Sequence, residues 1–262
     1  MIIKVSAGLA SLLLALAAAL TLRVAPAAAA APTECNGALT GGPFDNVEVP
    51  SGAHCEMASA VVTGNVLVRA DASLRASASQ IAGNVIGQNS AWVCLQFAST
   101  LGGDFFVKGG ALHTTTGFDI GVTVGGHARV MDNAGLTFID AANVVGNVDV
   151  SNNTGTIEVE FNTIGGNVTL AHNLVPPVYT GGPPQPAPGG CGLPTTFILQ
   201  AGVMSNINNT LPIANMHVIN NSGTGGKTVA GNTVKNIICL NNDPPFVGGP
   251  NVVAQHAVGQ CF

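Results

Sequence analysis

Charged side chains are scarce in this sequence. Lys, Arg, Asp and Glu make up 8% of the 262 residues, about a third of the fraction usual in globular proteins. The eight basic residues are scattered and nowhere form a basic run. We therefore expect no nucleic-acid partner, because such partners are bound through clustered Lys and Arg side chains that displace counterions from phosphates.

Motifs of common enzyme and metal sites are missing as well. The chain has no Cys-x-x-Cys, no Gly-x-Ser-x-Gly and no phosphate-binding loop. The six histidines stand at scattered positions without zinc-ligand spacing: His54, His113, His127, His172, His217 and His256. We expect neither a bound metal ion nor a cofactor.

The N-terminus has the layout of an export signal. Lys4 is followed by an apolar run from Ala7 to Leu22 and then by an Ala-rich tract. This order is typical of a secretory signal peptide, here residues 1–31. The apolar run is short for a membrane-spanning helix, and no apolar tail follows at the C-terminus, so we expect no membrane span after cleavage.

A short cassette returns along residues 32–262. It most often reads Asn-Val-x-Val, as in NVDVSNN and NVTLAHN. The nine copies open at Asn46, Asn65, Asn84, Asp104, His127, Asn147, Asn167, Asn215 and Asn236. The steps between openers are 19, 19, 20, 23, 20, 20, 48 and 21 residues. A single period of this length, with one large insertion, is the signature of a solenoid.

Within each cassette, polarity alternates with a period of two. The positions after the opener are mostly Val, mixed and Val, as in Val148 and Val150 around Asp149, which predicts a short strand with one buried face. Gly precedes most openers, and Asn, Asp or Gly marks the far corner, as in Gly146 and Asn153. We expect these residues to turn the chain through left-handed backbone conformations. The Asn side chains are also expected to hydrogen-bond from coil to coil.

These patterns predict an all-β, single-stranded parallel β-solenoid with about 20 residues per coil, wound right-handed. A second strand is expected around Ile157 and Val159, and a third inward residue at Ile164. The tract PPVYTGGPPQPAPGGC cannot form a coil and predicts a Pro/Gly-rich insertion at about 175–194. The alternative, an antiparallel β-sandwich, would require irregular strand spacing and hairpin turns.

Six cysteines in an exported chain suggest up to three disulfides. They are Cys35, Cys55, Cys94, Cys191, Cys239 and Cys261. The first two lie 20 residues apart and the last two 22, so each pair is about one coil apart. Because coils stack about 4.8 Å apart, both pairs fall within disulfide reach, and each is expected to close one end of the solenoid. The remaining pair, Cys94 with Cys191, would fold the insertion back along the coils.

Three outward positions on successive coils are apolar: Leu67, Ile86 and Phe106. A row of outward apolar residues is unusual on a polar solenoid. Two interpretations stay open. Either the insertion or an end segment covers the row, or the row is a docking face for a partner or another copy.

Asp140 and Glu160 occupy the same position on adjacent coils. Such stacking places two carboxyl groups at about the 5 Å separation of retaining glycosidases. The same pair suits a calcium ion. The third interpretation is a solvated acidic face that also includes Glu158.

The cassettes and the ending NIICLNNDPPFVGGPNVVAQHAVGQC resemble a group of uncharacterised secreted bacterial proteins with Gly-Asn-Val-x-Val repeats. In that group a Cys in the last cassette and a near-terminal Gly-Gln-Cys recur, here Cys239 and Gly259 to Cys261. The resemblance implies a parallel β-solenoid (β-helix) and export, and it implies no activity. Within the wider β-helix class some members are polysaccharide lyases and hydrolases, and others are adhesins or polymer-forming scaffolds.

We therefore expect an exported, non-enzymatic protein with a structural, adhesive or envelope-associated role, located outside the cell or at its surface. Its partners would be a polysaccharide, another envelope protein or another copy, met through Leu67, Ile86 and Phe106. The alternative is a carbohydrate-active enzyme, a polysaccharide hydrolase or lyase, that uses Asp140 and Glu160.

Overall fold

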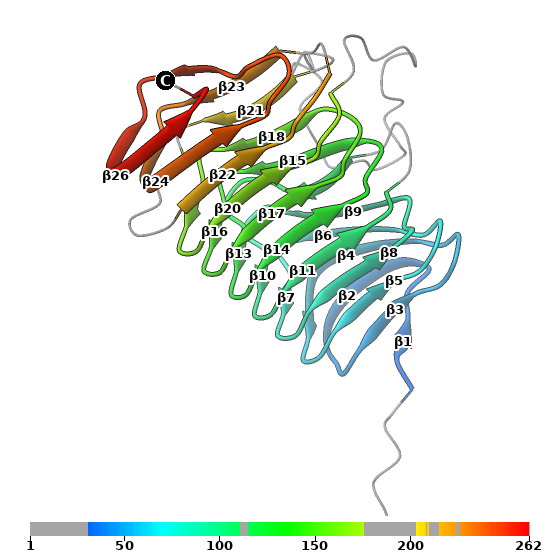
Figure 1. The fold of residues 1–262 in the computed structure, drawn as a ribbon. Coiled ribbons are helices and arrows are strands. Elements are labelled where there is room, and N and C mark those ends of the chain that lie inside the picture. Colours follow the sequence, from blue (N-terminus) through cyan, green and yellow to red (C-terminus); the bar gives the residue numbers. More distant parts are fainter. Residues whose placement is uncertain are drawn as a thin grey trace, which may run out of the picture. The chain divides into compact units, whose positions relative to one another are not determined.

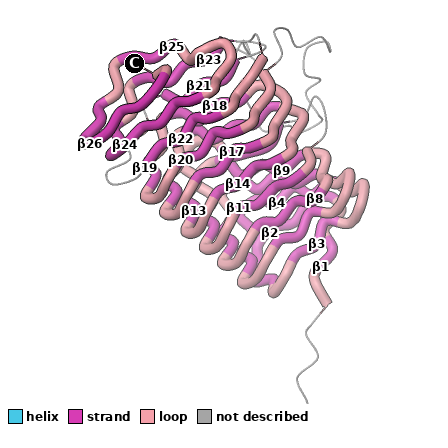
Figure 2. Tube along the Cα trace, in the orientation of Figure 1, coloured by secondary structure: helices cyan, strands magenta, loops and turns pink. Residues whose placement is uncertain are grey.

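The chain is a parallel β-solenoid (Figure 1 and Figure 2). The computed structural model describes residues 31–110, 115–175, 203–207, 209, 215–223 and 226–261. Within these ranges every regular element is a β-strand, and strands pair in parallel with their counterparts on neighbouring coils. In the same ranges, no helix has the length and apolarity needed to cross a membrane. The predicted fold class is confirmed.

One wall of the coil is an eleven-stranded sheet built from the cassettes (Figure 1). Its strands, in spatial order, are β1 (Thr33–Glu34), β3 (Val47–Val49), β5 (Val66–Val68), β8 (Val85–Gln88), β11 (Phe105–Lys108), β14 (Ala128–Met131), β17 (Val148–Ser151), β20 (Val168–Ala171), β22 (Asn215–Ile219), β24 (Thr233–Leu240) and β26 (Val252–Gly259). Val47 lies opposite Val66, and Val148 opposite Val168. Stacked openers are 19 to 23 residues apart, with one step of 48, so the predicted period and alignment are confirmed.

Two further walls complete each coil. The second wall contains β6 (Ser73–Ser77), β9 (Trp92–Gln96), β12 (Thr115–Phe118), β15 (Leu136–Asp140), β18 (Ile157–Glu160), β21 (Val203–Ile207), β23 (Gly226–Ala230) and β25 (Val247–Gly249). The third contains β7 (Gln80–Ile81), β10 (Thr100–Leu101), β13 (Thr123–Val124), β16 (Asn143–Val144) and β19 (Thr163–Ile164). The long strand β4 (His54–Val62) pairs with both β6 and β7 on one side and with β2 (Gly37–Phe44) on the other.

The core runs along the inside of all three walls. Val148 and Val150 on the first wall, Ile157 and Val159 on the second, and Ile164 on the third are all fully buried. Each such side chain contributes about 1.5–3 kcal/mol to folding. The predicted second strand and the third inward residue are thus confirmed.

Ladders of polar side chains connect the coils at the corners. In each ladder a side-chain acceptor takes the backbone N–H of the equivalent residue on a neighbouring coil, as Asn153 Oδ1 does with Asn133 at 2.8 Å. The exposed ladder runs through Asn46, Asn65, Asn84, Asp104, His127, Asn147, Asn167 and Asn215. Two mostly buried ladders run through Asn133, Asn153, Asn173, Asn221 and Asn242, and through Asn162, Asn209, Asn232 and Asn251. The predicted coil-to-coil bonding of Asn is confirmed.

The predicted role of the corner residues in turning the chain was partly wrong. Left-handed backbone is found one residue before the buried Asn positions, at Asp132 (φ 53°) and Asn152 (φ 56°). Gly146 and Gly166, which precede openers, do not adopt positive φ. They are needed for space, since a Cβ added at Gly166 would lie 2.4 Å from Asn147 Oδ1. The glycine makes room for the ladder side chain of the preceding coil.

Disulfides join the first and last coils to their neighbours. Cys35 bonds Cys55 with the Cα atoms 5.4 Å apart, and Cys239 bonds Cys261 with the Cα atoms 5.8 Å apart. These are the two one-coil pairs that the spacing predicts. Cys94 is also disulfide-bonded, while its predicted partner Cys191 and the insertion after residue 175 lie outside the described residues.

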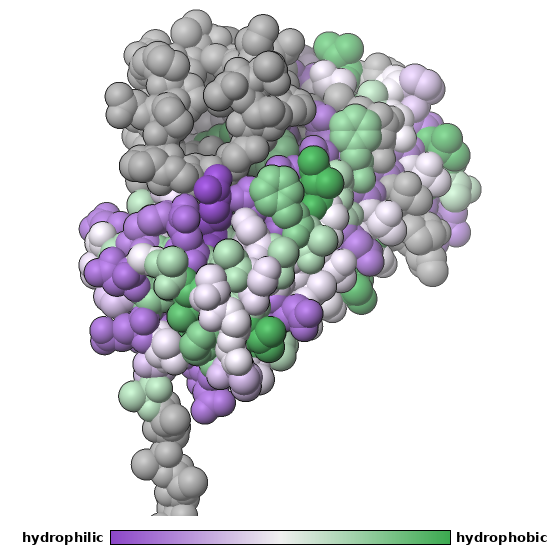
Figure 3. Space-filling view, turned by 180° about the vertical axis from the view of Figure 1, so that it is seen from behind, coloured by the Kyte–Doolittle hydropathy of each residue, from purple (hydrophilic) through white to green (hydrophobic). Residues whose placement is uncertain are grey.

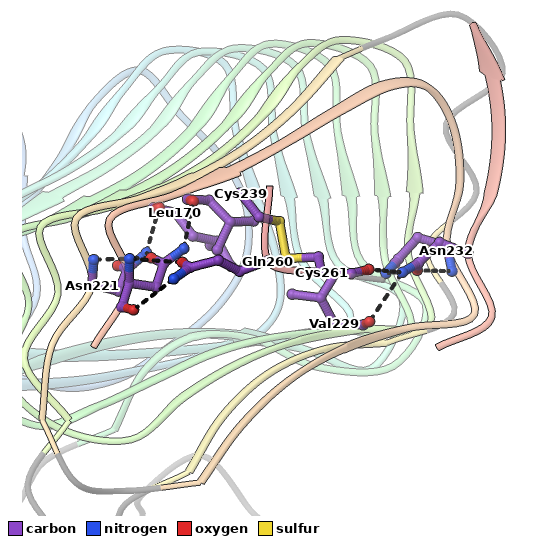
Figure 4. Close-up of a disulfide and its surroundings, with 10 residues drawn as sticks. Leu170, Asn221, Val229, Asn232, Cys239, Gln260 and Cys261 are labelled. Atoms are coloured by element: carbon purple, nitrogen blue, oxygen red, sulfur yellow. Dashed lines mark hydrogen bonds between the residues drawn. A yellow bond between two sulfur atoms is a disulfide. The ribbon is translucent and has the colours of Figure 1, made fainter. Parts of the chain in front are cut away.

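Hydrogen-bonded polar groups form a cap beside the C-terminal disulfide (Figure 4). Gln260 Oε1 accepts the Asn242 backbone N–H at 2.9 Å, and the Gln260 amide donates to the Asn242 carbonyl at 3.3 Å. Asn251 donates to the Cys261 carbonyl at 3.3 Å. Gln260 therefore takes the place of the next Asn in the ladder of Asn221 and Asn242.

Candidate functional site

The first candidate site is the row of Leu67, Ile86 and Phe106. The three residues are direct register partners on β5, β8 and β11, so they lie about 4.8 Å from one strand to the next. All three are partly exposed. None of them is fully covered, and their use as a docking face stays a prediction.

Charged residues border this apolar row at both ends. Glu48 lies opposite Leu67 and Arg129 opposite Phe106. Arg69 Nε donates to Glu48 Oε1 at 2.8 Å, and this hydrogen bond lowers the pKa of Glu48. Beyond Arg129 the register partner is Asp149, and Arg129 Nε lies 3.3 Å from Asp149 Oδ2. Both charges are paired within the protein, so the row is an apolar strip between two neutralised polar borders.

The second candidate site lies on the outer side of the second wall. Asp140 and Glu160 are register partners on β15 and β18, as the spacing predicts. Glu158 lies two residues before Glu160 and faces the same side. Asp119 follows the register pair of Phe118 and Ile139 on the preceding coil, so four carboxyl groups gather on three successive coils.

This acidic group is more buried than a solvated face would be. Burial, with the charges of Glu160 and Asp119, raises the pKa of Asp140 to about 6. Burial, with the charges of Glu160 and Asp140, raises the pKa of Glu158 to about 7. Asp140 Oδ1 is buried without a hydrogen-bond partner. Two carboxyl groups thus take up and release protons near neutral pH, which is the property required of a general acid.

In the described part of the chain, no three or more His, Cys, Asp or Glu side chains form a group that could hold a metal ion. The acidic group has the Cα register that the glycosidase interpretation requires.

The burial of the second wall was missed in the sequence. Trp92, Cys94 and Gln96 alternate with the inward Val93 and Leu95, yet all three are at least 95% buried. A run such as WVCLQ, apolar at both odd and even positions, is the available signal for a strand covered on both faces. The ring of Trp92 also packs against His54, with the centroids 5.4 Å apart.

Exposed apolar side chains at the corner after this wall were missed too. Phe97 is 52% exposed, Ile120 59% and Phe161 55%. Phe97 and Phe161 have positive φ, a conformation that bulky residues seldom adopt. Seen from behind, apolar groups lie among polar ones on the surface of the molecule (Figure 3).

Comparison with known proteins yields no relative. No family model, no curated protein and no solved structure matches this chain.

Proposed function

We propose that this protein is exported and acts without catalysis, as an adhesive, structural or envelope-associated solenoid. The observation that carries the proposal is the strip of Leu67, Ile86 and Phe106, partly exposed and in register. Apolar side chains left partly in water add less to folding than buried ones. Three in a row on a rigid wall therefore favour contact with a partner.

Export is supported by two features of the chain. Residues 1–31 have the order of charge, apolar run and small residues of a signal peptide. The disulfides Cys35–Cys55 and Cys239–Cys261 are of a kind that persists in oxidising compartments. Both features agree with a protein that works outside the cytosol.

The chemistry of the strip favours a weakly charged partner. Its borders are ion pairs, Arg69 with Glu48 and Arg129 with Asp149, so no unpaired charge is offered there. A polysaccharide surface or an apolar strip of another envelope protein fits such a face.

The test is co-sedimentation of the purified protein with insoluble polysaccharides and with cell envelopes. We expect the wild type to bind and a Leu67→Ser, Ile86→Ser, Phe106→Ser variant to lose at least about tenfold in affinity, equal to 1.4 kcal/mol. Ile238→Ser is the matched control, because Ile238 is partly exposed in the same outward column on β24. Equal binding by all three proteins would exclude the strip as the contact surface.

A second candidate function is cleavage of a polysaccharide by Asp140 and Glu160, as in a polysaccharide hydrolase or lyase. It is favoured by the pKa of Asp140, raised to about 6, beside a register partner that is also acidic. In this mechanism Asp140 would protonate the leaving oxygen while Glu160 acts as nucleophile. Sugar released into the supernatant by the wild type, but not by Glu160→Gln, would establish it and overturn the non-catalytic proposal.

A further inference from the structure

The outermost strand of the first wall has one open edge. β26 pairs with β24 on one side, and no described strand pairs with it on the other. Seven of its eight residues are exposed, with Val252 at 64% and Val258 at 47%. An unpaired strand edge of this length is a template for another strand.

Hydrogen bonds to β24 and its neighbours identify the backbone groups left at the open edge. The N–H groups of Val252, His256 and Gln260 donate to Asn232 O, Asn236 Oδ1 and Cys239 O. Because N–H groups alternate in direction along a regular strand, those of Val253 and Ala257, on either side of a register shift, point away from β24. The N–H and carbonyl groups of these residues form the open edge.

The sequence of β26 does nothing to block pairing. VVAQHAVG contains no Pro, no Lys and no acidic residue. At the other end of the solenoid, the outer strand β2 contains Pro43, and its register with β4 shifts twice. Proline, charge and bulges are the usual protection of natural sheet edges. β2 has a proline and two register shifts, whereas β26 has one register shift, between Val253 and His256, and no proline.

Charge also distinguishes the two ends. Of the thirteen acidic residues, only Asp243 follows Glu160. The first coils instead carry Glu34, Asp45, Glu48 and Glu56. Two C-terminal ends therefore approach with little repulsion between acidic side chains.

The polar cap excludes simple continuation of the coil by another copy. Gln260 terminates the ladder of Asn242, and the Cys239–Cys261 disulfide lies beside it (Figure 4). The backbone edge of β26 is left open at this end.

We propose that β26 pairs antiparallel with β26 of a second copy across a two-fold axis, joining two eleven-stranded sheets into one. A two-fold contact uses the same surface on both partners, and an uncharged strand meets itself without like charges opposed. This contact lies on a different edge from the Leu67, Ile86, Phe106 strip, so it is independent of the proposed function.

Sedimentation velocity of the purified protein with its disulfides intact tests this proposal. Protein concentrations of about 1 to 100 µM cover the dissociation constants of a moderate interface. We expect a monomer–dimer equilibrium that stops at the dimer. Val253→Pro removes an open-edge donor, and Ala257→Lys places one cation of each copy in the contact. Each should raise the dissociation constant about 100-fold. Ala38→Lys on the exposed β2 is the matched control and should leave it unchanged.

A measurement on the wild type alone keeps the proposal testable if a variant folds poorly. Amide exchange of Val253 and Ala257 should slow as protein concentration rises, while exchange of β11 stays constant. A monomer at every concentration would overturn the proposal. So would oligomers that grow beyond two copies, or equal loss of dimer in Ala38→Lys.

Discussion

Asn153 and Asn133 are joined across two coils by one amide group. Asn153 Oδ1 accepts the Asn133 backbone N–H at 2.8 Å, while Asn153 Nδ2 donates to Val130 O at 3.1 Å. Both Asn residues are at least 99% buried. A single side chain thus satisfies a buried donor and a buried carbonyl on the same neighbouring coil.

Asn153→Ala is expected to lower the free energy of unfolding by about 2–4 kcal/mol, because it leaves those two buried groups unsatisfied. Asn147→Ala is the matched control from the exposed ladder. There Asn147 Oδ1 accepts the Asn167 N–H at 2.7 Å, and water replaces it at a cost of about 1 kcal/mol or less. Urea denaturation with the disulfides intact measures both. Equal losses of unfolding free energy in the two variants would show that burial does not determine how much an Asn of the ladder contributes to stability.

Gly166→Ala is expected to destabilise the protein by about 2 kcal/mol or more, through overpacking. The new Cβ would lie 2.4 Å from Asn147 Oδ1 and 2.6 Å from the Gly146 carbonyl oxygen. Gly52→Ala is the control, since Gly52 has φ +71° with no atom within 4 Å of the added Cβ. Only backbone strain applies there, about 1–2 kcal/mol. The prediction fails if Gly52→Ala proves the more harmful change in urea denaturation.

The protein is expected to lose stability as pH rises from about 4 to about 8. The lower limit is set by the pKa of Asp and Glu side chains in an unfolded chain, which is near 4 for both. The pKa values of Asp140 and Glu158 are raised in the folded state, to about 6 and about 7. The folded state therefore binds more protons than the unfolded state in this window, and stability falls as those protons leave.

After discounting both acids for their partial solvent exposure, the loss between pH 5 and pH 8 is on the order of 2 kcal/mol, or about 5 °C in Tm. Calorimetry at pH 5 and pH 8 measures it. Glu158→Gln should reduce the difference and raise Tm at pH 8. Asp71→Asn, at an exposed corner, serves as the control. A Tm that is higher at pH 8 than at pH 5 would contradict the assignment.

Replacing both cysteines of the C-terminal disulfide by Ser is expected to loosen the last coils. Cys239–Cys261 closes a loop of 22 residues in sequence separation, worth about 3 kcal/mol in the chain-entropy model. Amide exchange should accelerate in β24 and β26 and stay unchanged in β3 and β5. The Cys35, Cys55 double Ser variant should show the opposite pattern. Uniform acceleration along the solenoid in both variants would mean that the disulfides do not act as end clamps.

Much of this architecture was readable from residue order alone. The spacing of Asn46, Asn65 and Asn84 and the alternation around them determine the coil length, the parallel stacking and the buried face, because each coil repeats the same short strand. The one-coil spacing of Cys35 and Cys55 determines that the two can meet.

Only the tertiary structure decided what those residues do. A glycine is needed at position 166 because the Asn147 side chain occupies the space beside it. Asn153 forms buried hydrogen bonds to the neighbouring coil and does not itself turn the chain. Such roles depend on contacts between coils, which no single cassette contains. The same holds for the raised pKa values of Asp140 and Glu158 and for the open edge of β26. Burial and strand order belong to the assembled solenoid, whereas local pattern describes one coil at a time.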